Sequence, residues 1–290
     1  MTVEPLDPRF VVARRALLNA LLALAPHRSA IVVAGAQAIY LRTGDADFAI
    51  TPFTIDGDVA INPSLLGADP RLEAAMRQAN FELTVRESGH EEPGIWVTPV
   101  IIDGKPDFVS VDLIVPEAVA PGRGRRAARL PGHGDRSTRR LVGLEGALVD
   151  HSPMLISSLD AGDTRSVTTE VAGPAALLVA KAHKIRDRVE AGRPGRIKDK
   201  DASDIVRLMQ TTSPGELACV FATLLADQVS SEATQQGLRY LRELFGRRGR
   251  RGIAMASNAL RLAMDRDTVE VICTTYITRL DDALGTSEPT

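Results

Sequence analysis

Hydrophobic and polar positions along the chain follow two periods, that of a helix and that of a strand. Both periods occur before residue 174, and the helical period dominates after it. Over residues 8–25 apolar side chains recur at every third or fourth position, which predicts an amphipathic helix. Residues 54–62 alternate between two faces, as a half-buried strand does. From residue 174 to about residue 282 the helical period dominates. The pattern therefore predicts an α/β front half followed by an all-helical back half.

Short apolar runs predict the remaining strands of the front half. Residues 31–34 are expected to form a buried strand that runs directly into a helix beginning at Gly35. Asp103-Gly104 is typical of a two-residue hairpin turn. A helix is expected over residues 69–79 and a Pro/Gly/Arg-rich loop over residues 116–140. Strands are expected at 81–86, 95–102, 108–115, 148–158 and 166–171.

The length of 290 residues suits two domains of ordinary size. We expect residues 1–165 to form the α/β domain and residues 166–290 a mostly helical one, whose helices break near residues 211–214 and 247–252. With 44% apolar and 25% charged residues the chain can bury a large core, which excludes a disordered protein.

The apolar runs and the cysteines indicate in which compartment the protein resides and whether it contacts a membrane. No apolar run approaches the roughly 18 residues that span a membrane. The first residues lack the basic and apolar regions of a secretion signal. Cys219 and Cys273 lie far apart and fit no metal or redox spacing. We therefore expect a cytoplasmic protein with no membrane contact.

Charge is uneven on a nearly neutral chain. The net charge of −2 excludes a general polyanion-binding protein. However, residues 122–140 contain seven arginines, and residues 247–251 contain four. Such local patches fit a phosphate-bearing partner, although a solvated arginine-rich loop remains an open alternative for each patch.

The first candidate for chemistry is Asp56-Gly57-Asp58. Residues two apart on a strand point to the same side, so both carboxylates would project from one face. Two close carboxylates repel each other unless a cation lies between them, and hard oxygen ligands suit Mg²⁺. The alternative is a tight turn, because Asp-Gly is a favoured turn pair.

Two further signals lie on neighbouring elements. Gly35-Ala36 stands at a strand-to-helix junction, where backbone N–H groups can approach a phosphate; a simple tight turn is the alternative. Asp112 lies within an apolar strand, where aspartate is costly unless it is paired or bound to metal. Its alternative is an edge strand with the carboxylate facing water.

A fourth signal lies in the back half. The predicted helix over residues 177–188 carries Lys181, Lys184 and Arg188 on one face. In the next helix Asp201 and Asp204 share a face. The alternative is a charged helical hairpin with no ligand.

Gly35, Asp56-Gly57-Asp58 and Asp112, in this order, resemble the motif of nucleotidyltransferases of the DNA-polymerase-β type. The residues around Lys181 and Asp204 resemble the back half of AbiEii-type toxins, which include the mycobacterial MenT group. The resemblance covers about residues 30–62, 108–115 and 174–208. It implies a mixed-sheet nucleotidyltransferase fold whose helical domain completes a cleft for NTP and acceptor.

The resemblance also implies roles. Asp56, Asp58 and Asp112 would hold two Mg²⁺ ions and, with Lys181 and Asp204, form the catalytic set. The reaction would move a nucleoside monophosphate from an NTP to the 3′ end of tRNA and block translation, and a cognate antitoxin protein is expected. Nucleotide contacts would come from Gly35, Ala36, Thr54, Lys181 and Lys184. RNA contacts would come from Arg123, Arg125, Arg126, Arg247 and Arg248.

Several positions depart from the family pattern. Ala36 stands where many members have serine, and Gly57 replaces a bulky apolar residue. Thr54 could contact the nucleotide or accept phosphate, or it could be an ordinary cross-strand threonine. With only 4% aromatic residues, recognition of the RNA backbone is favoured over stacking on bases.

Two rival functions remain open at this point. One is a nucleotidyltransferase that acts on a small molecule, such as an antibiotic, or on a protein. The other is a non-catalytic module that binds nucleotide or antitoxin.

Overall fold

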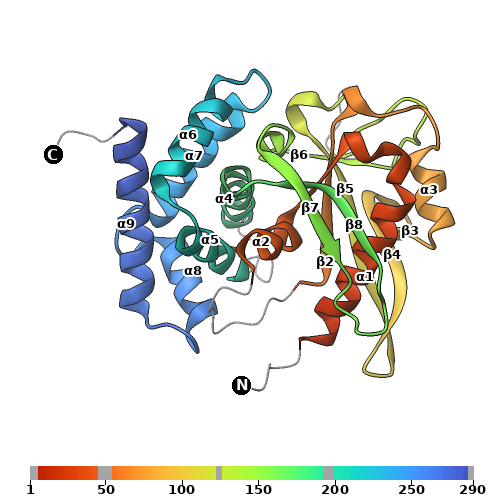
Figure 1. Ribbon diagram of the computed structural model, residues 1–290, viewed down its shortest axis with the longest axis horizontal. Coiled ribbons are helices and arrows are strands. Elements are labelled where there is room, and N and C mark those ends of the chain that lie inside the picture. The colour runs from red at the N-terminus through yellow and green to blue at the C-terminus, as the bar shows by residue number, and fades with distance from the viewer. Residues whose placement is uncertain (1–5, 45–53, 122–125, 192–198, 287–290) are drawn as a thin grey trace. The chain divides into compact units, whose positions relative to one another are not determined.

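The computed structural model describes residues 6–44, 54–121, 126–191 and 199–286, which belong to two compact units. We call the first the sheet unit; it comprises Met1–Leu41, Thr51–Leu141 and His151–Ala172. The second, the helical unit, comprises Arg42–Ile50, Val142–Asp150 and Gly173–Thr290. The predicted α/β front half and all-helical back half are confirmed (Figure 1).

The sheet unit is built on a mixed eight-stranded sheet with the order β3-β4-β5-β2-β1-β8-β7, while β6 pairs with β5. The pairs β1/β8, β2/β5 and β5/β6 are parallel, and the other pairs are antiparallel. The last strand, β8, begins at residue 166, where the helical domain was expected to begin. It pairs within this sheet instead. The strands are β1 (Ile31–Ala34), β2 (Asp56–Ile61), β3 (Glu82–Val85), β4 (Glu91–Ile102), β5 (Lys105–Pro116), β6 (Arg139–Leu141), β7 (His151–Ser157) and β8 (Ser166–Ala172).

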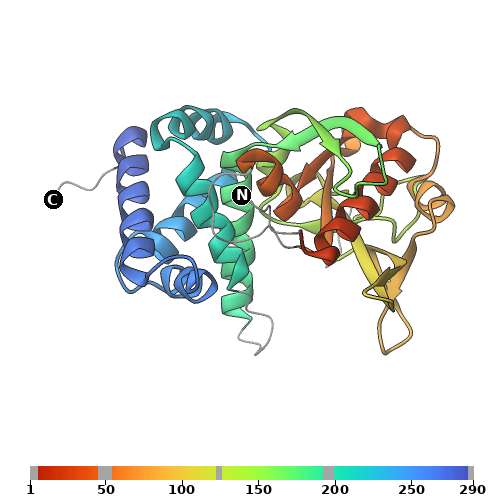
Figure 2. The same cartoon turned by 60° about the horizontal axis from the view of Figure 1, so that its bottom comes forward.

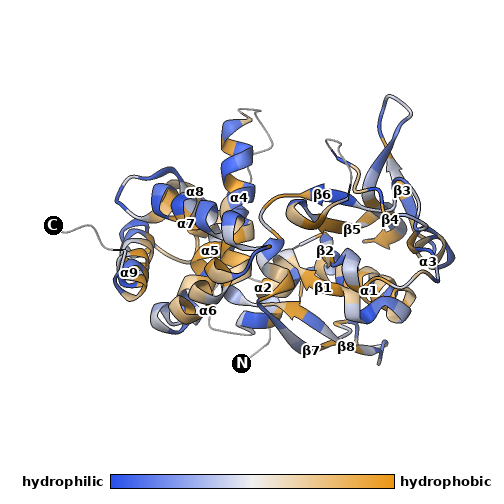
Figure 3. Ribbon diagram, turned by 90° about the horizontal axis from the view of Figure 1, so that it is seen from above, coloured by the Kyte–Doolittle hydropathy of each residue, from blue (hydrophilic) through white to orange (hydrophobic). Residues whose placement is uncertain are grey.

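Helix α1 (Pro8–Ala23) begins at the N-cap Asp7, whose carboxylate accepts the N–H of Arg9. It lies against the sheet at β2, β4, β5 and β8 (Figure 2). Gly57 of β2 is the point of closest approach, because a Cβ there would stand 3.3 Å from a methyl carbon of Leu17. The glycine between the two aspartates therefore belongs to the packing of α1. Figure 3 shows the apolar character of β1 and β5 in orange.

Shorter helices and one tight turn complete the sheet unit. Helix α2 (Gly35–Thr43) follows β1 without a loop and continues past the unit boundary, and α3 (Leu72–Gln78) begins three residues later than the pattern predicts. Asp103 and Gly104, both with positive φ, make the predicted two-residue turn between β4 and β5. Short 3₁₀ helices lie at η1 (Ala25–Ala30), η2 (Pro63–Leu65) and η3 (Glu117–Val119).

The helical unit consists of α4 (Pro174–Glu190), α5 (Lys200–Thr211), α6 (Pro214–Ala226), α7 (Ser231–Phe245), α8 (Arg251–Leu260), α9 (Arg266–Leu284) and the 3₁₀ helix η4 (Glu145–Leu148). The predicted breaks near residues 211–214 and 247–252 are confirmed. The breaks after α6 and α8 were not predicted, because the apolar period continues on both sides of them. Across the described ranges of the chain, no helix is both long and apolar enough to cross a membrane.

Candidate functional site

Three carboxylates project from one face of the sheet unit. In the parallel register of β2 and β5, Asp58 lies beside Asp112 and Asp56 beside Ser110. Register partners point to the same side, so Asp56, Asp58 and Asp112 share the face opposite to Gly57 and α1. The tight-turn alternative for residues 56–58 is wrong, because these residues are paired in a strand.

The edge-strand alternative for Asp112 is wrong as well. Strand β5 lies between β4 and β2, so Asp112 has a paired neighbour on each side, Ile95 and Asp58. Its side chain is 11% exposed and that of Asp58 is 12% exposed. Two carboxylates this far removed from water need positive charge or hydrogen-bond donors close by. We call Asp56, Asp58 and Asp112 the acidic cluster.

Gly35 allows Asp58 to approach the start of α2. Ala34 of β1 pairs with Asp58, and the next residue, Gly35, has a φ of +64°. A Cβ on Gly35 would collide with the carboxylate of Asp58. Only glycine fits this close approach without strain. The first turn of a helix carries partial positive charge, which favours a carboxylate beside it. Ala36, the next residue, is buried.

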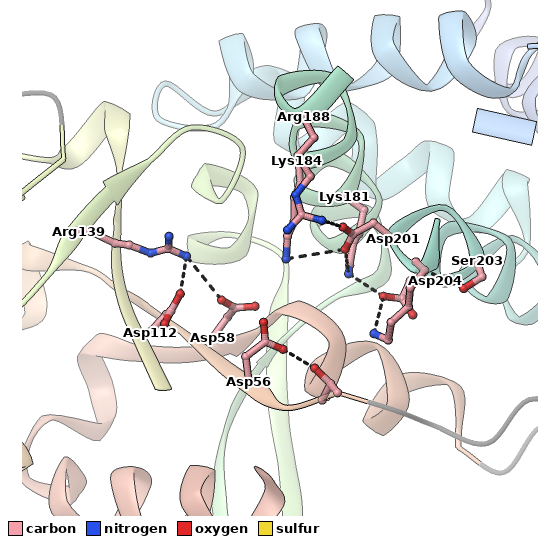
Figure 4. Close-up of polar contacts among 12 residues, drawn as sticks. Asp56, Asp58, Asp112, Arg139, Lys181, Lys184, Arg188, Asp201, Ser203 and Asp204 are labelled. Atoms are coloured by element: carbon pink, nitrogen blue, oxygen red, sulfur yellow. Dashed lines mark hydrogen bonds and ion pairs between the residues drawn. The ribbon is translucent and has the colours of Figure 1, made fainter. Parts of the chain in front are cut away.

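Thr54 lies just before β2 and is buried. Its hydroxyl donates a hydrogen bond to the carboxylate of Asp56 (Figure 4). It is therefore a neighbour of the acidic cluster and not the cross-strand threonine considered as its alternative. The phosphate contact of Thr54 stays a prediction.

A guanidinium group enters the acidic cluster. A terminal nitrogen of Arg139 lies 2.6 Å from Oδ2 of Asp112 and 4.0 Å from Oδ1 of Asp58 (Figure 4). Arg139 is not among the predicted site residues, because residues 116–140 were expected to form a loop. Residues 139–141 instead form β6, which pairs with β5 beyond Asp112, where the pairing of β5 with β4 stops. A three-residue strand is too short to display a period, so the pattern carries no signal for it.

The acidic cluster has the donor chemistry of a Mg²⁺ site. Three carboxylates against one guanidinium leave it with net negative charge, and hard carboxylate oxygens are ligands that Mg²⁺ prefers. Among the residues that the structure describes, no three His, Cys, Asp or Glu side chains lie together in a group that could hold a metal ion. The metal ligands therefore stay a prediction.

A second charged cluster lies in the helical unit, where α4 meets α5. Nζ of Lys181 donates to Oδ1 of Asp201 at 2.7 Å and to Oδ2 of Asp204 at 2.6 Å. The predicted contact between Lys181 and Asp204 is confirmed. Asp201 is the partner that sequence reasoning did not assign, although it shares the helical face of Asp204. All three side chains are at most 7% exposed.

More cations surround the two carboxylates. Arg188 pairs with Asp201, and Nζ of Lys184 lies 3.7 Å from Oδ1 of Asp201 (Figure 4). Nζ of Lys200 lies 3.5 Å from Oδ2 of Asp204. The side chains of Lys184, Arg188 and Lys200 are between 22% and 33% exposed. We call this set the basic cluster: Lys181, Lys184, Arg188, Lys200, Asp201 and Asp204.

Ion pairing fixes the charge states of Lys181 and Asp201 at the centre of the basic cluster. Burial by itself would lower the pKa of Lys181, but the carboxylates of Asp204 and Asp201 outweigh it and raise that pKa. Burial would likewise raise the pKa of Asp201, but Lys181, Lys184 and Arg188 outweigh it and lower that pKa. Lys181 is thus held as an ammonium and Asp201 as a carboxylate.

The predicted RNA contacts have separate surroundings. Arg123 and Arg125 lie outside the described residues. Arg126 is exposed, and its guanidinium lies 3.9 Å from Glu92. Arg247 and Arg248 are exposed between α7 and α8, and Arg248 lies 4.0 Å from Glu270. No described contact tests their role with RNA.

No model of a known protein family matches this chain, and no curated protein matches it.

The two clusters differ in what they can do. The acidic cluster gathers oxygen donors and carries net negative charge, which suits a cation. The basic cluster has four cations against two carboxylates, and its partly exposed side chains suit a phosphate group.

Proposed function

We propose that this chain is a Mg²⁺-dependent nucleotidyltransferase that transfers a nucleoside monophosphate from an NTP to an RNA acceptor. One observation carries the proposal: Asp56, Asp58 and Asp112 lie on one face of the adjacent strands β2 and β5. The nucleotidyltransferase fold and the place among AbiEii/MenT-type toxins belong to the same proposal, and they rest on the resemblance of the motifs.

The residues of the acidic cluster have separable tasks in this reaction. Asp56 and Asp58 are the metal ligands on β2, and Asp112 is the ligand on β5. When bound, Mg²⁺ supplies the charge that activates the attacking hydroxyl and stabilises the pyrophosphate that leaves. Gly35 lets Asp58 lie against the start of α2, and Thr54 orients the carboxylate of Asp56.

In the proposal the basic cluster binds phosphate groups of the NTP. A lysine ammonium has three N–H donors. Lys181 donates one hydrogen bond to Asp201 and one to Asp204. The remaining donor of Lys181 and the partly exposed ammonium of Lys184 are the phosphate contacts. Asp204 and Asp201 hold Lys181 in place.

The acceptor in the proposal is the 3′ end of tRNA, and its modification stops translation in the cytoplasm. Exposed arginines support an RNA acceptor, since Arg126, Arg247 and Arg248 can contact the phosphate backbone without reading bases. A cognate antitoxin protein is the expected partner. This part of the proposal rests on the resemblance and on the charge pattern.

One observation favours a second candidate, a non-catalytic module that binds nucleotide or antitoxin. Arg139 lies on Asp112, the carboxylate that the reaction assigns to metal. If Arg139 held Asp112 permanently, two carboxylates on β2 would remain for the metal.

An assay with labelled NTPs separates these functions. The protein is incubated with Mg²⁺, each α-labelled NTP and, in turn, total tRNA, bulk protein and small amines. We expect label on tRNA, and replacement of Asp58 by asparagine should lower transfer by about 10³-fold or more, because an amide does not offset the metal's charge. Asp107→Asn removes an exposed carboxylate from β5 outside the acidic cluster and should transfer like the wild type. Label on amines or protein would favour the rival enzymes, and no label anywhere would favour the non-catalytic module.

A further inference from the structure

Arg139 reaches the acidic cluster from a backbone that its neighbours hold in place. The N–H of Gly94 donates to the carbonyl of Arg136 at 2.9 Å, and the indole N–H of Trp96 donates to the carbonyl of Ser137 at 2.9 Å. A Cβ on Gly94 would collide with the backbone nitrogen of Arg139, so this segment lies directly against β4. The side chain of Arg139 therefore starts from a fixed point beside the carboxylates.

The side chain of Arg139 is more exposed than the carboxylates it faces. The Arg139 side chain is 28% exposed, against 11% for Asp112 and 12% for Asp58. Its contact with Asp112 is close at 2.6 Å, whereas its distance to Asp58 is 4.0 Å. The ion pair with Asp112 is therefore the one that a metal ion would have to replace in the acidic cluster.

We propose that Arg139 is an internal counter-cation that a divalent metal ion displaces from Asp112, so that Arg139 sets the metal concentration at which the acidic cluster fills. This inference rests on the proposed function, because it takes the three carboxylates as metal ligands. The exchange replaces one ion pair by another and breaks no covalent bond. Metal concentration is the variable that drives the exchange.

The inference has two opposite consequences for an Arg139 variant. Without metal, Arg139 reduces the repulsion between Asp58 and Asp112, and its removal leaves two poorly hydrated carboxylates side by side. With metal, Arg139 is a competitor, and its removal makes binding tighter. An arginine with only a structural role would give the first effect and not the second.

The test measures Mn²⁺ binding to the full chain without nucleotide, by electron paramagnetic resonance of the free ion. Arg139→Gln should half-saturate at an Mn²⁺ concentration about tenfold lower than the wild type, the scale of one lost charge contact at a partly exposed site. Its thermal midpoint should be lower without metal and should rise further when Mn²⁺ is added. Arg136→Gln is the matched control, because it removes an equal charge from the same segment and Arg136 contacts the carbonyl of Glu91.

The variant Asp112→Asn separates the release of Asp112 by Arg139 from a general effect of charge on Mn²⁺ binding. In that background Arg139 has no carboxylate to release, so Arg139→Gln should change Mn²⁺ affinity far less than it does in the wild type. If Arg139→Gln does not fold, Arg139→Lys replaces it, since a lysine makes a single point contact and should also lower the Mn²⁺ concentration required.

The outcomes distinguish the two claims. Saturable Mn²⁺ binding that Asp58→Asn weakens, together with unchanged or weaker binding in the Arg139 variants, would overturn the inference and leave the proposed function standing. Equal tightening in Arg136→Gln would also overturn the inference. If neither the wild type nor any variant binds Mn²⁺, both the inference and the proposed function fail.

Discussion

Asp58 stands where three elements meet, and a single glycine makes room for it. Gly35 has positive φ, and its missing side chain would otherwise occupy the position of the Asp58 carboxylate. Asp58 also faces Asp112 on β5. The geometry of the acidic cluster therefore depends on a residue that carries no functional group.

Replacing Gly35 by alanine should disturb both folding and the acidic cluster. The positive φ costs a non-glycine residue about 1–2 kcal/mol, and displacement of Asp58 adds to that. Gly44→Ala is the matched control, because Gly44 also has positive φ and nothing lies within 4 Å of its Cβ position. Urea unfolding should show the larger loss for Gly35→Ala, and Mn²⁺ affinity should fall in that variant alone. Equal unfolding losses in the two variants would contradict the close approach of Asp58.

Lys181 and Asp201 link the stability of the helical unit to pH. The pKa of Lys181 is raised above its usual value of 10.5, so its stabilisation is complete below pH 10.5 and is lost as pH rises through the folded value. The pKa of Asp201 is lowered below 3.8, so its stabilisation is complete above pH 3.8 and is lost as pH falls through the folded value. Between these limits the pair keeps its full effect.

Asp201→Asn should remove part of the acid sensitivity. We expect the wild type to lose more free energy of unfolding than the variant when the pH is lowered from about 6 to about 2, because only in the wild type does the unfolded chain bind a proton at residue 201 that the folded chain does not bind. Urea unfolding followed by circular dichroism measures the difference. At neutral pH the variant should be the less stable protein, since Lys181 then lacks one buried partner. Curves that stay parallel down to the lowest pH would refute the lowered pKa of Asp201.

At the scale of elements, the packing of α1 against β2 accounts for the glycine inside the Asp-Gly-Asp sequence. Leu17 occupies the space that a larger residue 57 would need. The two faces of β2 therefore have separate tasks, with Gly57 turned to the core and the aspartates turned away from it.

Gly57→Val should destabilise the sheet unit by about 1–3 kcal/mol through overpacking. Leu17→Ala in the same chain should recover part of that loss, because it removes the methyl groups that the valine meets. Urea unfolding of the two single variants and the double variant tests the coupling. Strictly additive losses would show that residue 57 does not press on α1.

The sequence predicts elements wherever a period has room to appear. The strands that became β2 and β5 are long enough to alternate, and Asp112 is conspicuous in an apolar run, so the three carboxylates could be found. Arg139 could not, because it is one of seven arginines in a segment without a period. Asp201 had a usable signal, its position one helical turn before Asp204, but spacing does not say which carboxylate an ammonium contacts.

At the scale of the whole molecule, a net charge of −2 conceals two clusters of opposite sign. The sheet unit carries the acidic cluster, and the helical unit carries the basic cluster. Carboxylate oxygens suit a metal ion, whereas ammonium and guanidinium groups suit phosphate. The two units therefore differ in the kind of ligand that their charges suit.

The most direct test of the nucleotidyltransferase proposal compares two positions of the label in one NTP. The wild type is incubated with Mg²⁺, total tRNA and an NTP labelled at either the α- or the γ-phosphate, with Asp58→Asn as the inactive reference. The proposal predicts labelled tRNA from the α-labelled NTP, labelled pyrophosphate from the γ-labelled NTP, and neither product from Asp58→Asn above about 10⁻³ of the wild-type rate. Label on tRNA from the γ-phosphate, or equal transfer by Asp58→Asn, would contradict the account.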